Sequence, residues 1–133
     1  MKSLTVPANI DRLEEVTGFV NELLGDVDMK TEFQIRLAVE EVFVNIASYA
    51  YAPGTGDAEV SCALLSDPKR VLIRFSDSGI PFDPTKLADA DLSEEAIMER
   101  VGGLGIFLVK KNMDQVTYTY EGGRNVLTLV KKL

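Results

Sequence analysis

Apolar side chains recur at helical spacing near the start of the chain. The periodic run begins after Asn9, a residue suited to cap a helix, and stops at Gly25, a common helix terminator. A second, nearly all-apolar run predicts a buried helix from about Thr31 to Tyr51. Ahead of both, residues 2–7 alternate weakly up to a proline, which predicts a short edge strand.

The second half of the chain carries most of the strand patterns. Alternation predicts strands at Glu59–Leu65 and Val71–Phe75, and a closing hairpin made of Val116–Tyr120 and Val126–Val130. A third helix fits Ile106–Met113. Five strands and three helices in this order predict an α+β sandwich with the helices on one face of the sheet.

The pattern breaks down between the third of these strands and the third helix. The stretch from Ser76 to Gly105 holds prolines and glycines, with one short helical piece expected at Ser93–Val101. About thirty residues without regular structure are unusual inside a compact domain, and such segments tend to be functional. We therefore expect a lid-like segment here.

Two polar residues stand out in the apolar second helix. Glu41 and Asn45 lie at positions i and i+4, one above the other on one helix face, whereas Glu40 points about 100° away. A carboxylate and a carboxamide buried without partners are costly, so this face is expected to open on something polar. Taken alone, the pair is better explained as a solvent-exposed stripe, which is common on helices.

Two further segments combine glycine with a position suited to a ligand. Asp77 and Gly79 come directly off the strand Val71–Phe75, where a ligand can approach the backbone closely; the alternative is a local turn in which Asp77 bonds nearby amides. Gly103 and Gly105 precede an apolar helix, where bare main-chain N–H groups form an anion cradle. Glycine-rich helix starts are common, and the spacing fits neither a dinucleotide fingerprint nor a P-loop.

The composition of the chain excludes several classes of function. A length of 133 residues predicts a single domain over residues 1–133. The absence of histidine excludes a Ser-His-Asp triad and a phosphoaccepting histidine, and the single cysteine, Cys62, is expected to be a buried thiol. A net charge of −7 opposes non-specific nucleic-acid binding. No stretch is apolar enough for a membrane span or a signal peptide, so a cytoplasmic protein is expected.

The polar and glycine-rich elements, read in order, resemble the signature boxes of the gyrase-like and histidine-kinase-like (GHKL) ATPases. Glu41-x-x-x-Asn45 resembles the box on the second helix, Asp77-x-Gly79 the adenine-reading box, and Gly103-x-Gly105 the box that ends the ATP lid. The run Leu37–Asn45 and the tail Phe82-Asp83-Pro84 narrow the resemblance to the anti-sigma-factor serine-protein kinases. The resemblance covers nearly the whole chain.

This resemblance implies a fold and the roles of four residues. The fold is a two-layer sandwich in which a mixed five-stranded sheet carries three helices on one face, with ATP beneath a mobile lid. Asn45 would ligate Mg²⁺, and Glu41 would act as the general base. Asp77 would accept a hydrogen bond from the adenine amino group, and Gly79 would leave room for the base.

The resemblance also implies how phosphates and partners are bound. Main-chain amides around Gly103 and Gly105 would hold phosphate oxygens. The acceptor would be a serine of a small anti-anti-sigma (STAS-domain) protein, and the same surface would sequester a sigma factor. Neither direct nucleic-acid binding nor a membrane is expected, and a homodimer is left open. The runner-up hypothesis is an ATP-gated binding switch with little or no kinase activity, and a third is an ATPase fragment of a histidine kinase.

The chain departs from the family pattern at two positions. Pro81 stands where many relatives carry a second glycine, and the segment around Asn125 replaces a threonine that often helps to read adenine. Asn125 either substitutes for that threonine or leaves the contact out. Arg100 is either a phosphate contact or a solvated helix charge. The four tyrosines are interpreted as packing residues.

Overall fold

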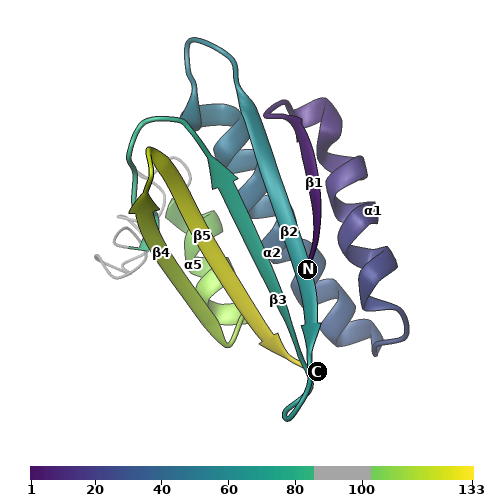
Figure 1. Ribbon diagram of the computed structural model, residues 1–133. Coiled ribbons are helices and arrows are strands. Elements are labelled where there is room, and N and C mark those ends of the chain that lie inside the picture. The colour runs from purple at the N-terminus through teal and green to yellow at the C-terminus, as the bar shows by residue number, and fades with distance from the viewer. Residues whose placement is uncertain (86–102) are drawn as a thin grey trace.

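The computed structural model describes residues 1–85 and 103–133 and arranges them in two layers (Figure 1). The helices are α1 (Leu13–Leu24), α2 (Met29–Asn45) and α5 (Gly103–Asn112), with a 3-10 turn at Ile10–Arg12 and a π-helical turn at Ile46–Ala50. The strands are β1 (Lys2–Pro7), β2 (Asp57–Leu65), β3 (Arg70–Asp77), β4 (Gln115–Glu121) and β5 (Arg124–Lys132). The short helix expected at Ser93–Val101 lies outside the described residues.

The five strands form one sheet in the order β1-β2-β3-β5-β4. All four pairings between these strands are antiparallel, so the expectation of a mixed sheet is wrong. Strands β3 and β4 do run in the same direction, but β5 lies between them and is antiparallel to both. A parallel pair would have required two strands of the same direction, such as β3 and β4, to be neighbours.

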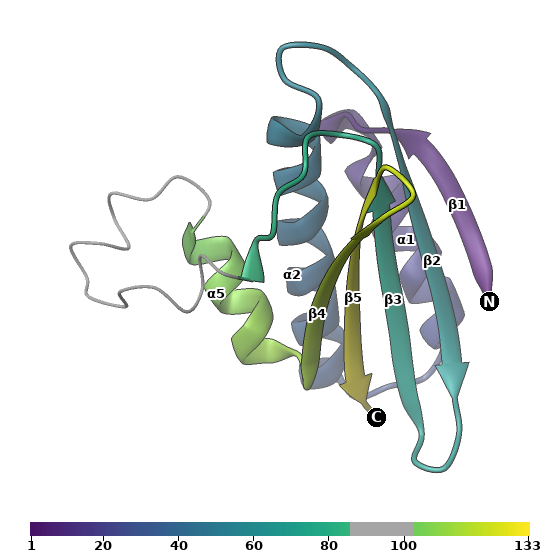
Figure 2. The same ribbon diagram turned by 60° about the vertical axis from the view of Figure 1, so that its left-hand side comes forward.

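The three helices cover one face of the sheet, as the turned view in Figure 2 shows. Helix α2 lies in the middle and packs against both α1 and α5. At the C-terminal end of α5, the Nζ atom of Lys131 donates to the main-chain oxygen of Asn112 at 2.7 Å, which ties α5 to β5. A cation at this end of a helix also interacts favourably with the helix dipole.

Local signals explain where the first two helices begin and end. Asn9 accepts a hydrogen bond from the main-chain N–H of Asp11, and Asp28 accepts one from that of Thr31 at 2.7 Å, so each satisfies an otherwise unpaired helical donor. Gly25 ends α1 with a φ of 64°, which glycine adopts without strain. Both Asn9 and Gly25 were correctly predicted as the limits of the first helical segment.

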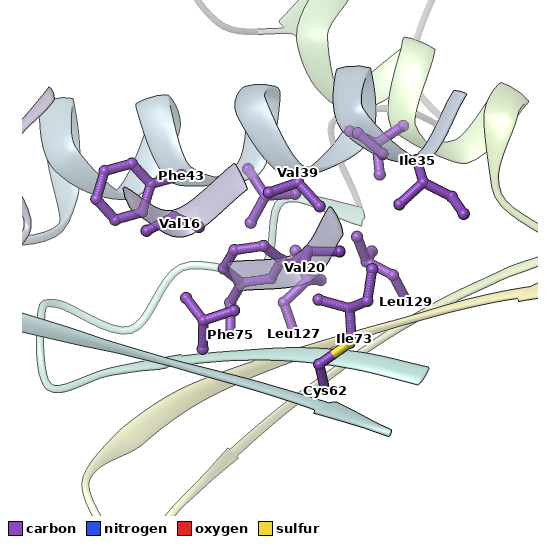
Figure 3. Close-up of a cluster of buried hydrophobic side chains, with 14 of the residues drawn as sticks. Val16, Val20, Ile35, Val39, Phe43, Cys62, Ile73, Phe75, Leu127 and Leu129 are labelled. Carbon is purple, nitrogen blue, oxygen red and sulfur yellow. The ribbon is translucent and has the colours of Figure 1, made fainter. Parts of the chain in front are cut away.

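The core lies between the helices and the sheet (Figure 3). Val16 and Val20 on α1 and Ile35, Val39 and Phe43 on α2 are almost fully buried against the inward-facing residues of the strands. That inward set is regular in β3, where Val71, Ile73 and Phe75 alternate with more exposed neighbours and Asp77 continues the series. The period of two therefore brings one carboxylate onto the helix-covered face at the strand's end.

Cys62 belongs to this core, as predicted. Its side chain is fully buried on β2, and burial raises the pKa of the thiol to about 11. The thiol is therefore protonated and shielded, and we assign it a packing role.

Candidate functional site

A pocket of about 400 Å³ opens between the two layers at the end of β3. Its size falls in the range of small-molecule sites. Its walls are mostly apolar, with a few polar groups from both layers. The lining residues are Val42, Asn45, Ile46, Tyr49, Ala50, Phe75, Asp77, Ile80, Phe82, Pro84, Ile106, Tyr118, Asn125, Val126 and Leu127.

Asp77 is the buried acidic group of this pocket. It is the last residue of β3, it is only 5% exposed, and it lies directly opposite Asn125 on β5. Its Oδ1 atom accepts hydrogen bonds from the main-chain N–H of Gly79 at 2.9 Å and from Nδ2 of Asn125 at 3.0 Å. No described residue donates to Oδ2. The local turn considered as an alternative is present, yet it uses only one of the two oxygens.

Gly79 allows a close approach between two segments of the protein itself. A Cβ atom added to Gly79 would come closer than 3.0 Å to the main-chain oxygen and carbon of Ala50. The next residue, Ile80, donates its main-chain N–H to that same Ala50 oxygen at 3.1 Å. Gly79 itself is not among the lining residues. The structure therefore gives it a role that the sequence did not suggest, which is to dock the Asp77 loop on the end of the second helix.

That docking point is a π-helical turn. The sequence predicted one helix through Tyr51, whereas α2 ends at Asn45 and residues Ile46–Ala50 form the wider turn. Tyr49 and Ala50 of this turn line the pocket. Single π-helical turns occur often at functional sites. Its apolar sequence gave no signal that would distinguish it from an ordinary helical turn.

Asn45 and Glu41 lie on α2 as predicted, but at different distances from the pocket. Asn45 is half-buried and lines it, whereas Glu41 is half-buried one turn earlier and is not among the lining residues. Across residues 1–85 and 103–133, neither side chain has a hydrogen bond or an ion pair. Neither group is therefore occupied by another part of the described chain.

The glycines of the third box open α5. The helix begins at Gly103, so Gly103 and Gly105 both lie in its first turn. Ile106, in the same turn, lines the pocket. The N–H groups of a first helical turn have no partner within the helix, and the structure thus brings such a helix start to the pocket. Arg100 lies outside the described residues.

Two tyrosines do more than pack. The Tyr51 hydroxyl donates to the main-chain oxygen of Asp57 at 2.6 Å and accepts from the main-chain N–H of Ser78 at 2.8 Å, so it supports the loop that follows Asp77. The Tyr118 hydroxyl donates to Oδ1 of Asn125. Partial burial raises the pKa of Tyr118. The interpretation of all four tyrosines as packing residues was incomplete because these contacts join segments far apart in sequence.

The described residues also limit the possibilities for metal binding and for a membrane span. No cluster of three or more histidine, cysteine, aspartate or glutamate side chains could hold a metal ion by itself. None of the described helices is both long and apolar enough to cross a membrane. If a metal ion were held at Asn45 by the described residues, it would therefore need further oxygen atoms from a ligand or from water.

Comparison with known proteins gives one family match and several relatives. The family model of the histidine kinase-like ATPase domain matches residues 6–131. The chain is 33% identical over 97 residues to the serine-protein kinase RsbW of Listeria monocytogenes serovar 1/2a, covering 70% of this chain and 61% of the relative. It is 29% identical over 100 residues to the serine/threonine-protein kinase BtrW of Bordetella bronchiseptica, covering 75% and 70%. The chain thus spans less than two thirds of the Listeria relative.

Solved structures share the fold. The histidine kinase domain of the blue-light activated histidine kinase from Erythrobacter litoralis EL346 has a TM-score of 0.61 at 17% identity, covering 96% of this chain and 62% of that one. The histidine kinase AdeS of Acinetobacter baumannii has a TM-score of 0.53 at 13% identity, covering 99% and 68%. The predicted two-layer α+β architecture is confirmed.

Proposed function

Because the chain belongs to the histidine kinase-like ATPase domain family, we propose that its pocket binds ATP with Mg²⁺ and that the protein transfers the γ-phosphate to a serine of a partner protein. The proposal rests mainly on one observation. Asp77 from the sheet and Asn45 from the helix layer line the same mostly apolar pocket, each with an oxygen that no described residue occupies. The naming of two relatives as serine and serine/threonine protein kinases supports this choice of acceptor.

Asp77 is suited to read adenine. Its Oδ1 atom is occupied by two donors, which leaves Oδ2 to accept from the 6-amino group of the base. Apolar side chains of Ile80, Phe75 and Leu127 line the same pocket and provide surfaces for the flat ring. A hydrogen bond to a charged acceptor in a buried site contributes about 1.5–3 kcal/mol.

The opposite end of the ligand would meet Asn45 and the start of α5. The amide oxygen of Asn45 is a hard ligand of the kind that Mg²⁺ accepts, and Asn45 lines the pocket. When bound, the ion neutralises charge on the phosphates and so favours phosphoryl transfer. The main-chain N–H groups of Gly103 and Gly105, in the first turn of α5, would hold phosphate oxygens at the positive end of the helix.

Glu41 would take the proton from the attacking serine hydroxyl. It stands one turn before Asn45 on the same helix face, and its carboxylate has no competing partner in the described part of the chain. A general base must reach its proton directly or through one water. Glu41 is not among the residues that line the pocket, so a partner's serine would have to enter between this carboxylate and the bound phosphate.

The partner class follows from the family resemblance. We propose that the acceptor is a STAS-domain anti-anti-sigma protein and that the protein also sequesters a sigma factor, which would place it in the cytoplasm. The alternative is an ATP-gated binding switch that grips its partner without phosphorylating it. The Glu41 carboxylate, which no described residue binds, favours the kinase, because nucleotide binding alone needs no base.

The decisive experiment is a transfer assay with γ-labelled ATP. The protein is incubated with Mg²⁺ and candidate STAS-domain proteins, and labelled residues are mapped by mass spectrometry. The kinase proposal expects one labelled serine on a cognate partner. If ATP promotes partner binding but no label is transferred, the switch is the correct function. If the protein binds no ATP, both are wrong.

A further inference from the structure

Asn125 lines the pocket, but its side chain is hydrogen-bonded to other residues of the protein and is not free to bind adenine. We propose that Asn125 is a positioning residue that determines the base selectivity of the pocket, because it orients the carboxylate of Asp77 towards a 6-amino purine. The inference rests on the ATP-binding function proposed above. Of the two alternatives that the sequence left open for Asn125, the inference takes the one in which Asn125 does not contact adenine itself.

The side-chain amide of Asn125 is fully engaged within the protein. Its Nδ2 atom donates to Oδ1 of Asp77 at 3.0 Å and to the main-chain oxygen of Ile80 at 2.9 Å, with a longer contact of 3.4 Å to that of Gly79. Its Oδ1 atom accepts from the main-chain N–H of Phe82 at 3.1 Å and from the Tyr118 hydroxyl. An amide with both ends occupied has little capacity left for a ligand. Its effect on the nucleotide must therefore be indirect.

The indirect effect acts through the rotation of one carboxylate. Oδ1 of Asp77 is fixed by Gly79 and by Asn125, so Oδ2 is the oxygen left to face a ligand. A fixed acceptor favours adenine, whose 6-amino group donates, and repels hypoxanthine, whose 6-oxo group accepts. Without Asn125, the Gly79 N–H would be the one donor among the described residues that still restrains the carboxylate. Rotation of the carboxylate would then reduce the difference in affinity between the two bases.

The neighbouring residue offers a matched control. Arg124 supports the same loop from the other face of the sheet, donating from Nε to Ser76 Oγ at 2.7 Å and from Nη1 to Ser78 Oγ at 3.2 Å. It makes no hydrogen bond to Asp77. Loss of Arg124 should thus loosen the loop without freeing the carboxylate.

The test is a calorimetric titration with Mg-ADP and Mg-IDP, which differ at the 6-position of the base. We expect the wild type to prefer ADP by roughly 10- to 150-fold, the range for a hydrogen bond to a charged group, and Asp77→Asn to abolish that preference. Asn125→Ala should reduce the ADP preference by about 3- to 10-fold. Arg124→Gln should change both affinities in the same proportion and keep the preference.

The outcomes separate this inference from the proposed function. If Asp77→Asn removes the preference but Asn125→Ala retains it, Asn125 is only a structural residue and the inference is wrong. A wild type that binds neither nucleotide refutes the ATP site and the inference with it. Should Asn125→Ala fail to fold, Tyr118→Phe gives the answer, because it removes one hydroxyl bound to Asn125. It is expected to lower the preference by a smaller factor, and an unchanged preference in this variant would overturn the proposal.

Discussion

The main-chain oxygen of Ala50 occupies the space into which a side chain on Gly79 would project. The same oxygen accepts the main-chain N–H of Ile80, so the π-helical turn and the loop that follows Asp77 meet chiefly through main-chain atoms. Geometry near Asp77 therefore depends on a contact between two backbones.

Gly79→Ala should displace this loop. The added methyl group meets main-chain atoms that cannot rotate away, so we expect a loss of about 1–3 kcal/mol in the free energy of unfolding and at least roughly tenfold weaker ADP binding. Urea denaturation and calorimetry measure the two effects. Gly18→Ala is the control: Gly18 lies on α1 with open space around it, so alanine should stabilise by about 0.5–1 kcal/mol. If the two variants had the same stability and ADP affinity, Gly79 would not dock the loop on the end of the second helix.

Asn45→Ala tests the magnesium assignment. Loss of the amide oxygen should weaken Mg-ADP binding on the order of tenfold, while ADP binding measured with a chelator changes much less. Asn21→Ala removes an exposed amide from α1, outside the pocket, and should alter neither. If affinity falls equally with and without Mg²⁺, Asn45 shapes the pocket and does not hold the ion.

Glu41→Gln tests the general base. The variant keeps the shape of the side chain but cannot take a proton, so transfer to a partner serine should fall about 10²- to 10⁴-fold while ADP affinity stays the same. Glu40→Gln, the adjacent half-buried glutamate about 100° round the helix, should leave transfer intact. Poor nucleotide binding by the Glu41 variant would instead make Glu41 a part of the pocket.

Cys62 provides a test of the core through pH. Its thiol has a pKa of about 11 in the fold against an ordinary value of 9.0, so the unfolded chain loses its proton first as pH rises. Stability should therefore fall between pH 9 and 11, with a slope approaching about 1.4 kcal/mol per pH unit from this group. The difference in unfolding free energy between the wild type and Cys62→Ala isolates this contribution. A pH-independent difference would mean that the thiol is accessible in the native state.

Local patterns predicted the elements well because their causes are local. Asn9 and Gly25 limit the first helical segment through hydrogen bonding and backbone conformation within a few residues. The strand alternation that ends in Asp77 is similarly local. Glu41 and Asn45 share a helix face because of helical geometry alone, although their chemical roles stay predictions.

The contacts that shape the pocket could not be predicted in this way. Asn125 meets Asp77 because β5 pairs with β3. The pattern of apolar and polar residues does not show which strands are neighbours. The same insertion of β5 made the sheet antiparallel throughout its described strands. The sequence pointed to Gly79 as a residue that makes room for a ligand, whereas the close neighbour in the structure is Ala50, which belongs to another element about thirty residues earlier in the chain.

The π-helical turn makes the pocket sensitive to chain length. An i→i+5 turn contains one residue more than an α-helical turn, so deleting a single residue from Ile46–Ala50 would allow α2 to continue without interruption. Every residue after the deletion would then rotate by about 100° and move about 1.5 Å along the axis. The Ala50 oxygen would leave the Ile80 amide, and the loop that follows Asp77 would lose this hydrogen bond. Substitutions in this segment can be accommodated by repacking, whereas a change in the number of its residues cannot.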